Sequence, residues 1–393
     1  MSWKDIRNEA AAWSLPFLPE KVQARIVQGP ATWRHRDLRQ VARAPFSETR
    51  LLIGPTNYAG QAAAWASAAE GLRGVEARSM QLYDPGGWSH FPADARVRRN
   101  VWRASHLWER RQLRELREFT HILIEAGRPV LGSNGENLTA DHVRRLQDMG
   151  LKVGLIWHGT DIRLPSDHVL VEPFSPYRDA PEEWVEKAEA TARANAALTE
   201  ETGVPEFVSN PYLLRYRPEA TWLPTLADAG VWQADRWAPS SPPTVLHVPS
   251  LGFWKGTEDV RRELLPLEKE GLIRYTEVSG VAPCEMPGLV AQSDIVIDGI
   301  RSGQYGVASV EAMLSGRVAV SHVWDSTREM LEEVSGERLP VVEATPSSLG
   351  RVVRELVRDP AELERRARAG RRFATSVHSP GMVCNALTEF LAD

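Results

Sequence analysis

The segment 294–323, DIVIDGIRSGQYGVASVEAMLSGRVAVSHV, decides the fold of this chain. It begins with an apolar strand, DIVID, and continues through a glycine-bearing loop over 299–306. A helix of small residues over 307–315 and a second apolar strand, RVAV, follow. Gly316 is expected to end the helix. Strand, loop, helix and strand in this order form one repeat of a parallel, doubly wound sheet.

The same alternation extends to both sides of a proline- and serine-rich stretch, DRWAPSSPPT, at 235–244. Before it, strands are predicted in RLLIG, FTHILIEAGRPVL, GLKVGLIWHGTD and EFVSN, with helices from about residue 61, in TADHVRRLQDMG and in APEEWVEKAEATARANAALTEETG. After it, strands are predicted in TVLHVPS and LIRYTEVSG, and helices in TEDVRRELLPLEKEG, CEMPGLVAQ and the C-terminal region. The prediction is an α/β protein with two doubly wound, Rossmann-like domains that face each other across a cleft.

The boundaries of these domains follow from length and composition. A chain of 393 residues exceeds what one hydrophobic core usually supports. Residues 1–49 are polar and interrupted by prolines, and we interpret them as an N-terminal helical extension. The first domain is predicted over 50–235 and the second over 244–378, with 235–244 as the linker and 379–393 as a C-terminal helix.

Composition narrows the classes of function. A net charge of −5 and a pI of about 6.1 argue against a general nucleic-acid binder. The two cysteines, Cys284 and Cys384, have no metal-ligand spacing and provide no disulfide framework. The first residues lack the apolar core of a signal peptide, and no apolar run approaches the ~20 residues of a membrane span. We therefore expect a cytoplasmic protein without a metal site.

The loop and helix of the opening segment predict an anion site. A helix that begins directly after a glycine-bearing loop presents free N–H groups and a partial positive charge, which favour phosphate. Glu311 lies about one turn inside this helix, where a carboxylate can accept hydrogen bonds from two adjacent hydroxyls, as in dinucleotide folds. The two features together predict a nucleotide or nucleotide-sugar site. The alternative is a glutamate that only complements the helix dipole.

Two further loops follow predicted strands. In PSLGFWKGT (249–257), Lys255 lies between two glycines and could place an ammonium group on a diphosphate; the alternative is a solvated loop lysine. In WHGTDIR, a strand ends in His158, which is close to Asp161 and Arg163. A titratable imidazole beside an acid and a base suits a residue that contacts a reacting group, whereas the alternative is a structural histidine.

These motifs together resemble the family 4 retaining glycosyltransferases, which have the GT-B fold. The resemblance is carried by KGT after the first strand of the second domain, by YGVASVEAMLSGRVAV and by HGTD in the first domain. GPTNYAGQAAAWA and FVSNPYLLRYRPEATWLP add looser similarity. The similar region extends from about residue 51 to the C-terminus and is strongest over 245–320. It implies that the C-terminal helix packs back toward the first domain.

The resemblance implies a donor site in the second domain. Glu311 corresponds to the second acid of the family's E-x7-E pattern, which binds the donor ribose. Lys255 corresponds to the lysine that contacts the donor diphosphate. Gly306, Val307 and Ala308 match the loop-to-helix junction whose amides meet phosphate.

The resemblance also implies roles in the first domain. His158 matches a histidine near the donor sugar, and we assign His158 and Asp161 as candidate catalytic residues. The loop 54–60 matches the segment between donor and acceptor. Asn57, Gly60 and Arg163 are therefore predicted on the acceptor side.

Two positions depart from the family pattern. Gly303 stands where the first acid of E-x7-E belongs. The arginine that precedes the lysine is also missing, with PSLGFW in its place. Asp298, at the end of the preceding strand, is a hypothetical substitute for part of the acid's role. These departures keep open a non-catalytic relative that binds a nucleotide sugar or a partner transferase.

The predicted function is transfer of a sugar from a nucleotide-diphosphate sugar, with retained anomeric configuration. The resemblance implies that the nucleotide sugar is a co-substrate, that no other cofactor or metal is needed, and that the acceptor is a small molecule, a glycan or a lipid. A GT-B nucleotide-sugar epimerase is a second alternative. The nucleobase, the sugar, the acceptor and the oligomeric state have no readable motif.

The basic segment 96–119, RVRRNVWRASHLWERRQLRELREF, carries eight arginines and three glutamates. One interpretation is a weak peripheral contact with an anionic membrane surface. The other is a helix of the first domain with a solvated basic face and i,i+4 pairs such as Arg111–Glu115. The interspersed glutamates favour the second interpretation.

Overall fold

The computed structural model describes residues 37–84, 91–132, 137–233, 239–249 and 252–392. Most of the predicted N-terminal extension, residues 1–36, lies outside this range, as does part of the predicted linker, 234–238. The chain forms two compact units, 1–155 and 156–393. This division differs from the predicted one at 235–244, because residues 168–178 form hydrogen bonds with loops of the second sheet.

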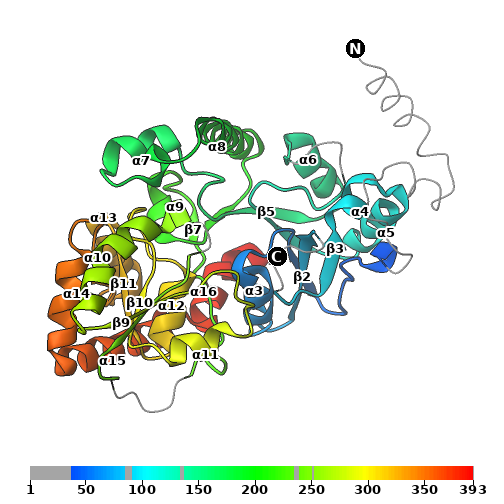
Figure 1. Ribbon diagram of the computed structural model, residues 1–393. Helices are drawn as coiled ribbons and strands as arrows, with labels where there is room; N and C mark the ends of the chain where they lie inside the picture. Colours follow the sequence, from blue (N-terminus) through cyan, green and yellow to red (C-terminus); the bar gives the residue numbers. More distant parts are fainter. Residues whose placement is uncertain (1–36, 85–90, 133–136, 234–238, 250–251, 393) are drawn as a thin grey trace. The chain divides into compact units, whose positions relative to one another are not determined.

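The first half of the chain alternates strands and helices (Figure 1). Its strands are β1 (Thr49–Gly54), β2 (Val75–Tyr83), β3 (Ala95–Arg98), β4 (His121–Glu125), β5 (Lys152–Trp157), β6 (Glu206–Val208) and β7 (Thr221–Trp222). They belong to one sheet with the order β3-β2-β1-β4-β5-β6-β7. Pairing is parallel between β1 and β2 and between β1 and β4, as expected for a doubly wound sheet.

Three helices of this half, over 61–69, 140–148 and 182–202, lie where the sequence predicts a helix. The helices of this half are η2 (Asp37–Arg39), η3 (Tyr58–Gly60), α3 (Gln61–Ala69), α4 (Arg99–Ala104), α5 (His106–Leu116), α6 (Ala140–Asp148), α7 (Pro165–Val171), η4 (Pro176–Arg178), α8 (Glu182–Thr202) and η5 (Pro211–Arg215). Thr139 caps α6 by accepting from the His142 amide. Gly203 ends α8 in the left-handed conformation, which costs glycine little.

The basic segment is a strand and two short helices rather than one helix. Its first residues belong to β3, and Ser105 separates α4 from α5 by accepting a hydrogen bond from the Trp108 amide. The guanidinium of Arg111 donates to the Leu38 carbonyl at 2.9 Å, and within the described residues it forms no ion pair with Glu115. None of the described helices combines the length and apolarity needed to cross a lipid bilayer.

The second sheet has five strands in the order β12-β11-β10-β8-β9. Its strands are β8 (Thr244–His247), β9 (Arg274–Glu277), β10 (Ile295–Ile297), β11 (Val318–Ser321) and β12 (Val342–Glu343). All the neighbouring pairs are parallel. β8, β10 and β11 are buried along their whole length, as continuous apolar runs in a parallel sheet require.

Helices cover this sheet in packed pairs, α10 with α14 and α12 with α15 (Figure 1). The helices of this half are α9 (Gly252–Lys255), α10 (Thr257–Lys269), α11 (Met286–Ala291), α12 (Val307–Leu314), α13 (Asp325–Ser335), α14 (Leu349–Arg358), α15 (Pro360–Val377) and α16 (Pro380–Leu391). The core between α10, α14 and the sheet includes Val245, Leu264 and Val353, all fully buried. In α16, the ring of Phe390 lies 5.6 Å from that of Phe207 on β6.

Candidate functional site

The carboxylate of Asp298 organises the end of β10. Asp298 follows the last residue of this strand and is 1% exposed. It accepts hydrogen bonds from the Gly306 amide at 2.7 Å and from the Ser309 hydroxyl at 2.7 Å, and it forms an ion pair with Lys255. Burial alone would raise the pKa of Asp298, but the Lys255 charge and these hydrogen bonds hold it below its usual value.

Gly256 brings Lys255 to this carboxylate. Gly256 has a φ of 75°, and a Cβ atom there would lie 2.9 Å from the side chain of Ile300, in the loop after β10. Only glycine permits this conformation and this close approach. The tight turn between α9 and α10 therefore presses the end of α9, which carries Lys255, against the loop that leads to α12.

Only some of the backbone N–H groups in the first turn of α12 form hydrogen bonds. Asp298 takes the amides of Gly306 and Ser309. The amides of Val307 and Ala308, which a helix leaves without an internal acceptor, have no hydrogen bond within the described residues. Both residues are partly exposed. Two N–H groups at the positive end of a helix, with an ammonium group nearby, form an arrangement that attracts an anion.

Glu311 lies one turn further along α12. Its side chain is partly buried, and no hydrogen bond to its carboxylate is formed within the described residues. Burial and, to a smaller extent, the Asp298 charge raise the pKa of Glu311 to about 8, against the opposing charge of Lys255. An acceptor group in such surroundings is poised to bind hydroxyl donors.

Gly303, at the position of the missing motif acid, has no room for any side chain. Its φ is 67°, and a Cβ atom at this position would overlap the indole nitrogen of Trp324. The backbone carbonyl of Gly303 accepts from the Trp324 amide at 3.0 Å. The indole thus occupies the space into which an acid at residue 303 would extend.

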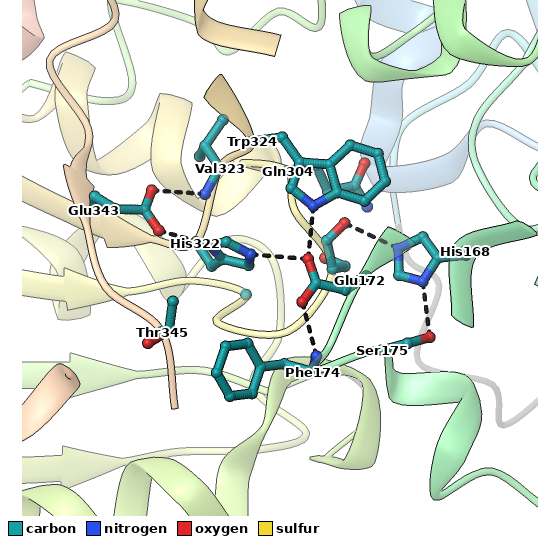
Figure 2. A network of polar contacts seen from close by, with 12 residues as sticks. His168, Glu172, Phe174, Ser175, Gln304, His322, Val323, Trp324, Glu343 and Thr345 are labelled. Carbon is teal, nitrogen blue, oxygen red and sulfur yellow. Dashed lines mark hydrogen bonds and ion pairs between the residues drawn. The ribbon is translucent and has the colours of Figure 1, made fainter. Parts of the chain in front are cut away.

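A buried acid, Glu172, binds the nitrogen of this indole (Figure 2). Glu172 follows α7 and is fully buried. Its carboxylate accepts from Trp324 Nε1 at 2.6 Å and from the Phe174 amide at 2.8 Å, and it contacts His322 Nε2 at 2.9 Å. All of these partners are supplied by the chain itself, so the carboxylate is fully engaged in structure.

His322 connects two acids from different parts of the sequence (Figure 2). Its Nε2 meets Glu172, and its Nδ1 meets Glu343 on β12 at 2.5 Å. Glu343 also accepts from the Val323 amide and pairs with Arg328. Burial disfavours the charged ring, but the hydrogen bonds to the two acids outweigh it and raise the pKa of His322 to about 9. The ring is therefore an imidazolium at neutral pH.

No protein-family model matches this chain, and no curated protein matches its sequence. Solved structures do match. Sucrose-phosphate synthase from Thermosynechococcus elongatus aligns with a TM-score of 0.55 at 13% identity, over 86% of this chain and 97% of that one. An alpha-glucosyltransferase in complex with UDP and a 13-mer DNA containing an HMU base aligns with a TM-score of 0.55 at 10% identity, over 90% and 100%.

A third match is HepE from Anabaena, in complex with UDP and glucose, with a TM-score of 0.52 at 12% identity over 87% of this chain and 98% of that one. The chain has the GT-B fold. This confirms the predicted fold class and the resemblance to GT-B glycosyltransferases. Membership of family 4 stays a prediction.

The structure places His158 and Asp161 of this GT-B chain in one tight turn after β5. Both carboxylate oxygens of Asp161 accept from the His158 amide, at 3.0 and 2.9 Å, and the Gly159 amide donates to the same group at 2.6 Å. Asp161 therefore fixes the backbone that presents His158. Its predicted catalytic role is not tested by this geometry.

Arg163, predicted on the acceptor side, lies at the end of the same turn. Its amide donates to the Gly159 carbonyl at 2.7 Å. Its guanidinium is buried between the rings of Tyr212 and Trp254, with Cζ 4.7 and 4.8 Å from their centroids. The contact with Trp254 connects this turn to α9, which also carries Lys255.

Asn57 and Gly60 lie in the loop between β1 and α3, in the first compact unit. Asn57 is buried, with a φ of 50°, and its side chain binds the Pro92 carbonyl and the Ala63 amide. The amides of Thr56 and Asn57 donate to the buried carboxylate of Glu125 at 2.9 and 2.8 Å. These contacts hold the loop in shape; whether the loop binds an acceptor stays a prediction.

Several residues of the site are absent from the sequence-based prediction. Ser309 has no local signal, because it is the third residue of α12 and its hydroxyl donates to Asp298 and does not cap the helix. Glu172, His322 and Trp324 carry no such signal, since about 150 residues separate the first from the other two. In the described part of the chain, no group of three or more His, Cys, Asp or Glu side chains could hold a metal ion.

Proposed function

We propose that this protein is a glycosyltransferase that transfers a sugar from a nucleoside-diphosphate sugar to an acceptor, with retained anomeric configuration. The proposal rests on the GT-B fold and on the chemistry at the start of α12. The observation that carries it is the pair of open amides at Val307 and Ala308 beside the ammonium group of Lys255. We assign this arrangement to the donor diphosphate.

Asp298 has a defined place in this proposal. In the absence of ligand its carboxylate is the counter-ion of Lys255 and accepts the Gly306 amide. A diphosphate at Val307 and Ala308 would share Lys255 with Asp298, so the lysine would face two anions. Asp298 is then a positioning residue for Lys255, and not a substitute for the missing motif acid.

Glu311 is assigned to the ribose of the donor. Its carboxyl group lies one turn into α12 from the open amides, and it has no partner within the described residues. The 2′- and 3′-hydroxyls of a ribose are two adjacent donors that can satisfy such a buried acceptor. Binding would therefore relieve the cost of keeping this group out of water.

The chemical step breaks the bond between C1 of the sugar and the diphosphate oxygen and forms a bond from C1 to an acceptor oxygen. The acceptor loses a proton, and the leaving diphosphate gains negative charge. Lys255 and the N–H groups of α12 stabilise that charge as it develops. Because they supply this positive charge, we propose that the reaction needs no metal ion or other cofactor. His158 is the candidate group near the sugar.

We test the donor site by calorimetric titration with UDP, the nucleotide present in the solved structures of two similar proteins. Wild type is compared with Lys255→Met and Glu311→Ala, and Lys269→Met, at the end of α10, is the control for loss of a lysine. Each site variant should lose about tenfold or more in affinity, as expected for a hydrogen bond to a charged group. Equal binding by all four proteins would exclude the proposed donor site. GDP, ADP and dTDP titrated in parallel identify the base.

The second candidate is a GT-B protein that binds a nucleotide sugar without transfer. The observation that favours it is the indole of Trp324 in the space of the missing motif acid. Slow hydrolysis of the donor separates the two candidates, because a transferase normally shows some transfer to water. A protein that binds UDP-glucose and releases neither free sugar nor an epimerised product would be a binder.

We also propose that the protein is cytoplasmic, that it does not bind nucleic acid and that its acceptor is a small molecule, a glycan or a lipid. The net charge of −5 supports the second point. One similar structure contains DNA, so a gel-shift assay with a 13-mer duplex is the direct test. Retardation of the duplex at physiological salt would overturn this part of the proposal.

A further inference from the structure

The guanidinium of Arg163 is buried without a hydrogen-bonded counter-ion. Its side chain is 1% exposed. Neither Nε nor Nη1 has a hydrogen-bond partner within the described residues. A buried cation without partners is unfavourable, because water no longer solvates it and nothing replaces the water.

The surrounding rings compensate only in part. Tyr212 and Trp254 lie on the guanidinium at centroid distances of 4.7 and 4.8 Å. Such cation–π contacts attract the charge but accept no hydrogen bond from the N–H groups in the guanidinium plane. The in-plane donors therefore remain available.

The acids nearest to Arg163 in the sequence are all committed to other groups. Asp161 accepts the amides of His158 and Gly159. Asp167 pairs with Arg215 through two hydrogen bonds of 3.0 and 2.9 Å. Glu172, a little further along, belongs to the His322 network and binds an indole and a backbone amide as well.

The third guanidinium nitrogen, Nη2, packs against the α-carbon of Gly159, next to the hydroxyl of Tyr212. This glycine has a φ of 155°. A Cβ atom there would lie 3.2 Å from Arg163 Nη2 and 3.9 Å from the hydroxyl of Tyr212. The Tyr212 hydroxyl is buried and, like Arg163 Nε and Nη1, has no hydrogen-bond partner within the described residues. The absence of a side chain at Gly159 lets the guanidinium pack closely against the backbone.

We propose that Arg163 is the anchor of a second anion site, which receives an oxyanion group, carboxylate or phosphate, of a bound substrate. The Tyr212 hydroxyl is the second donor of the site. The identity of the substrate rests on the proposed function, whereas the site itself does not. A planar guanidinium with free in-plane donors is the side chain best suited to two oxygens of one oxyanion.

Arg163 and Lys255 affect the pKa values of different groups. Burial and the positive charge of Arg163 together lower the pKa of His168 to about 4. The charge of Lys255 instead lowers the pKa values of Asp298 and Glu311. Trp254, which precedes Lys255 in α9, is the connection between the two sites.

The test is thermal unfolding of the full chain, as wild type and as Arg163→Met, in chloride and in inorganic phosphate at equal ionic strength. We expect phosphate to raise the Tm of wild type saturably and to leave Arg163→Met unchanged. In chloride, Arg163→Met should melt at the same temperature as wild type or higher, because methionine removes an uncompensated buried charge. The proposal would be overturned if Arg163→Met melts at a lower temperature than wild type in chloride and both proteins respond equally to phosphate. Arg163 would then have only a structural role, stacked between the two rings.

A second variant and three ligands identify the source of the oxyanion. Tyr212→Phe removes the second donor without changing charge, and it should weaken the phosphate response. UDP, UDP-glucose and UDP-glucuronate are then titrated into wild type and Arg163→Met. A tenfold loss for UDP-glucuronate alone assigns the site to a carboxylate on the donor sugar, and an equal loss for all three assigns it to the phosphates. Unchanged affinities together with an unchanged phosphate response overturn the proposal.

These outcomes remain distinct from a failure of the proposed function. If UDP does not bind wild type, the donor site is wrong, but the phosphate response of Arg163→Met still tests the anion site. If Lys255→Met loses UDP binding and Arg163→Met shows no defect with any of the ligands, the donor site stands and the anion site does not.

Discussion

The indole Nε1 of Trp324 donates a hydrogen bond of 2.6 Å to the buried carboxylate of Glu172, which lies 152 residues earlier in the chain. The same indole occupies the space above Gly303, where the resemblance to family 4 glycosyltransferases predicts an acid. No acid stands at residue 303. Glu172 cannot replace it, because its carboxylate already binds His322 and the Phe174 amide. The consequences for stability can be measured at three positions.

The first prediction concerns Gly303. We expect Gly303→Ala to cost about 2–5 kcal/mol, the sum of about 1–2 kcal/mol for a left-handed alanine and about 1–3 kcal/mol for overpacking against Trp324. Gly316 is the matched control, since its φ of 65° is nearly the same and a Cβ atom there meets nothing within 4 Å. Gly316→Ala should therefore show only the smaller backbone cost in urea unfolding.

A combined variant separates the two contributions. Trp324→Ala removes the side chain against which a methyl group at residue 303 collides, so its effect and that of Gly303→Ala should be less than additive. Equal costs for Gly303→Ala and Gly316→Ala would mean that the indole does not occupy the position described.

The second prediction concerns His322. Its pKa is raised from 6.5 to about 9 by Glu172 and Glu343, despite burial. The stabilisation is therefore fully present below pH 6.5 and is lost as the pH rises from 6.5 to 9. His322→Gln should remove this decline and should cost about 3 kcal/mol at pH 6.5, because Glu172 loses its buried cationic partner.

The measurement is the free energy of unfolding from urea titrations between pH 6 and pH 9.5. His106→Gln is the control, because His106 is half exposed and its contact with Glu109 is a long one of 3.7 Å. Parallel pH profiles for wild type and His322→Gln would contradict the assignment of an imidazolium to this site.

The third prediction concerns Glu311. Burial raises its pKa from 4.5 to about 8, so the native state binds this proton more tightly than the unfolded state does. Stability from this group is then highest below pH 4.5 and falls as the pH rises to 8, by at most about 1.4 kcal/mol per pH unit. Because the side chain is partly exposed, we expect a total of about 1–3 kcal/mol.

Glu311→Gln has no titrating group and should not show this fall. Relative to wild type, the variant should gain stability between pH 5 and pH 8. Glu355→Gln, on the exposed face of α14, is the control for the substitution itself. A constant difference between wild type and Glu311→Gln across this range would mean that the carboxyl group is solvated, which would also weaken its assignment to ribose.

Much of the fold could be predicted because its signals are local. The strands β8, β10 and β11 are continuous apolar runs, and glycine or a capping hydroxyl marks the ends of α6, α8 and α12. β2 and β3 are not among the predicted strands. Both mix charged and apolar residues, since only part of each strand is buried. The basic segment after β2 was interpreted as one helix for the same reason.

The candidate site could be predicted only in part. Lys255, Glu311 and the amides of α12 follow strands or glycines in a pattern that points to phosphate. The sequence does not show that Asp298 already binds Lys255 and two amides of α12. These contacts depend on distances of a few ångströms between loops, which no spacing in the sequence reveals.

The sequence by itself determined most of the strands and helices, the doubly wound α/β class and the residue types in the loop before α12, because apolar periodicity, glycine positions and caps act over a few residues. The GT-B class came from the resemblance of its motifs to a known family. Only the tertiary structure decided which charges are paired and which are not. It placed an indole at Gly303, committed Glu172 to His322 and left Arg163 buried without a counter-ion. Burial and pairing of charges depend on neighbours that are distant in sequence, so they exist only after the chain has folded.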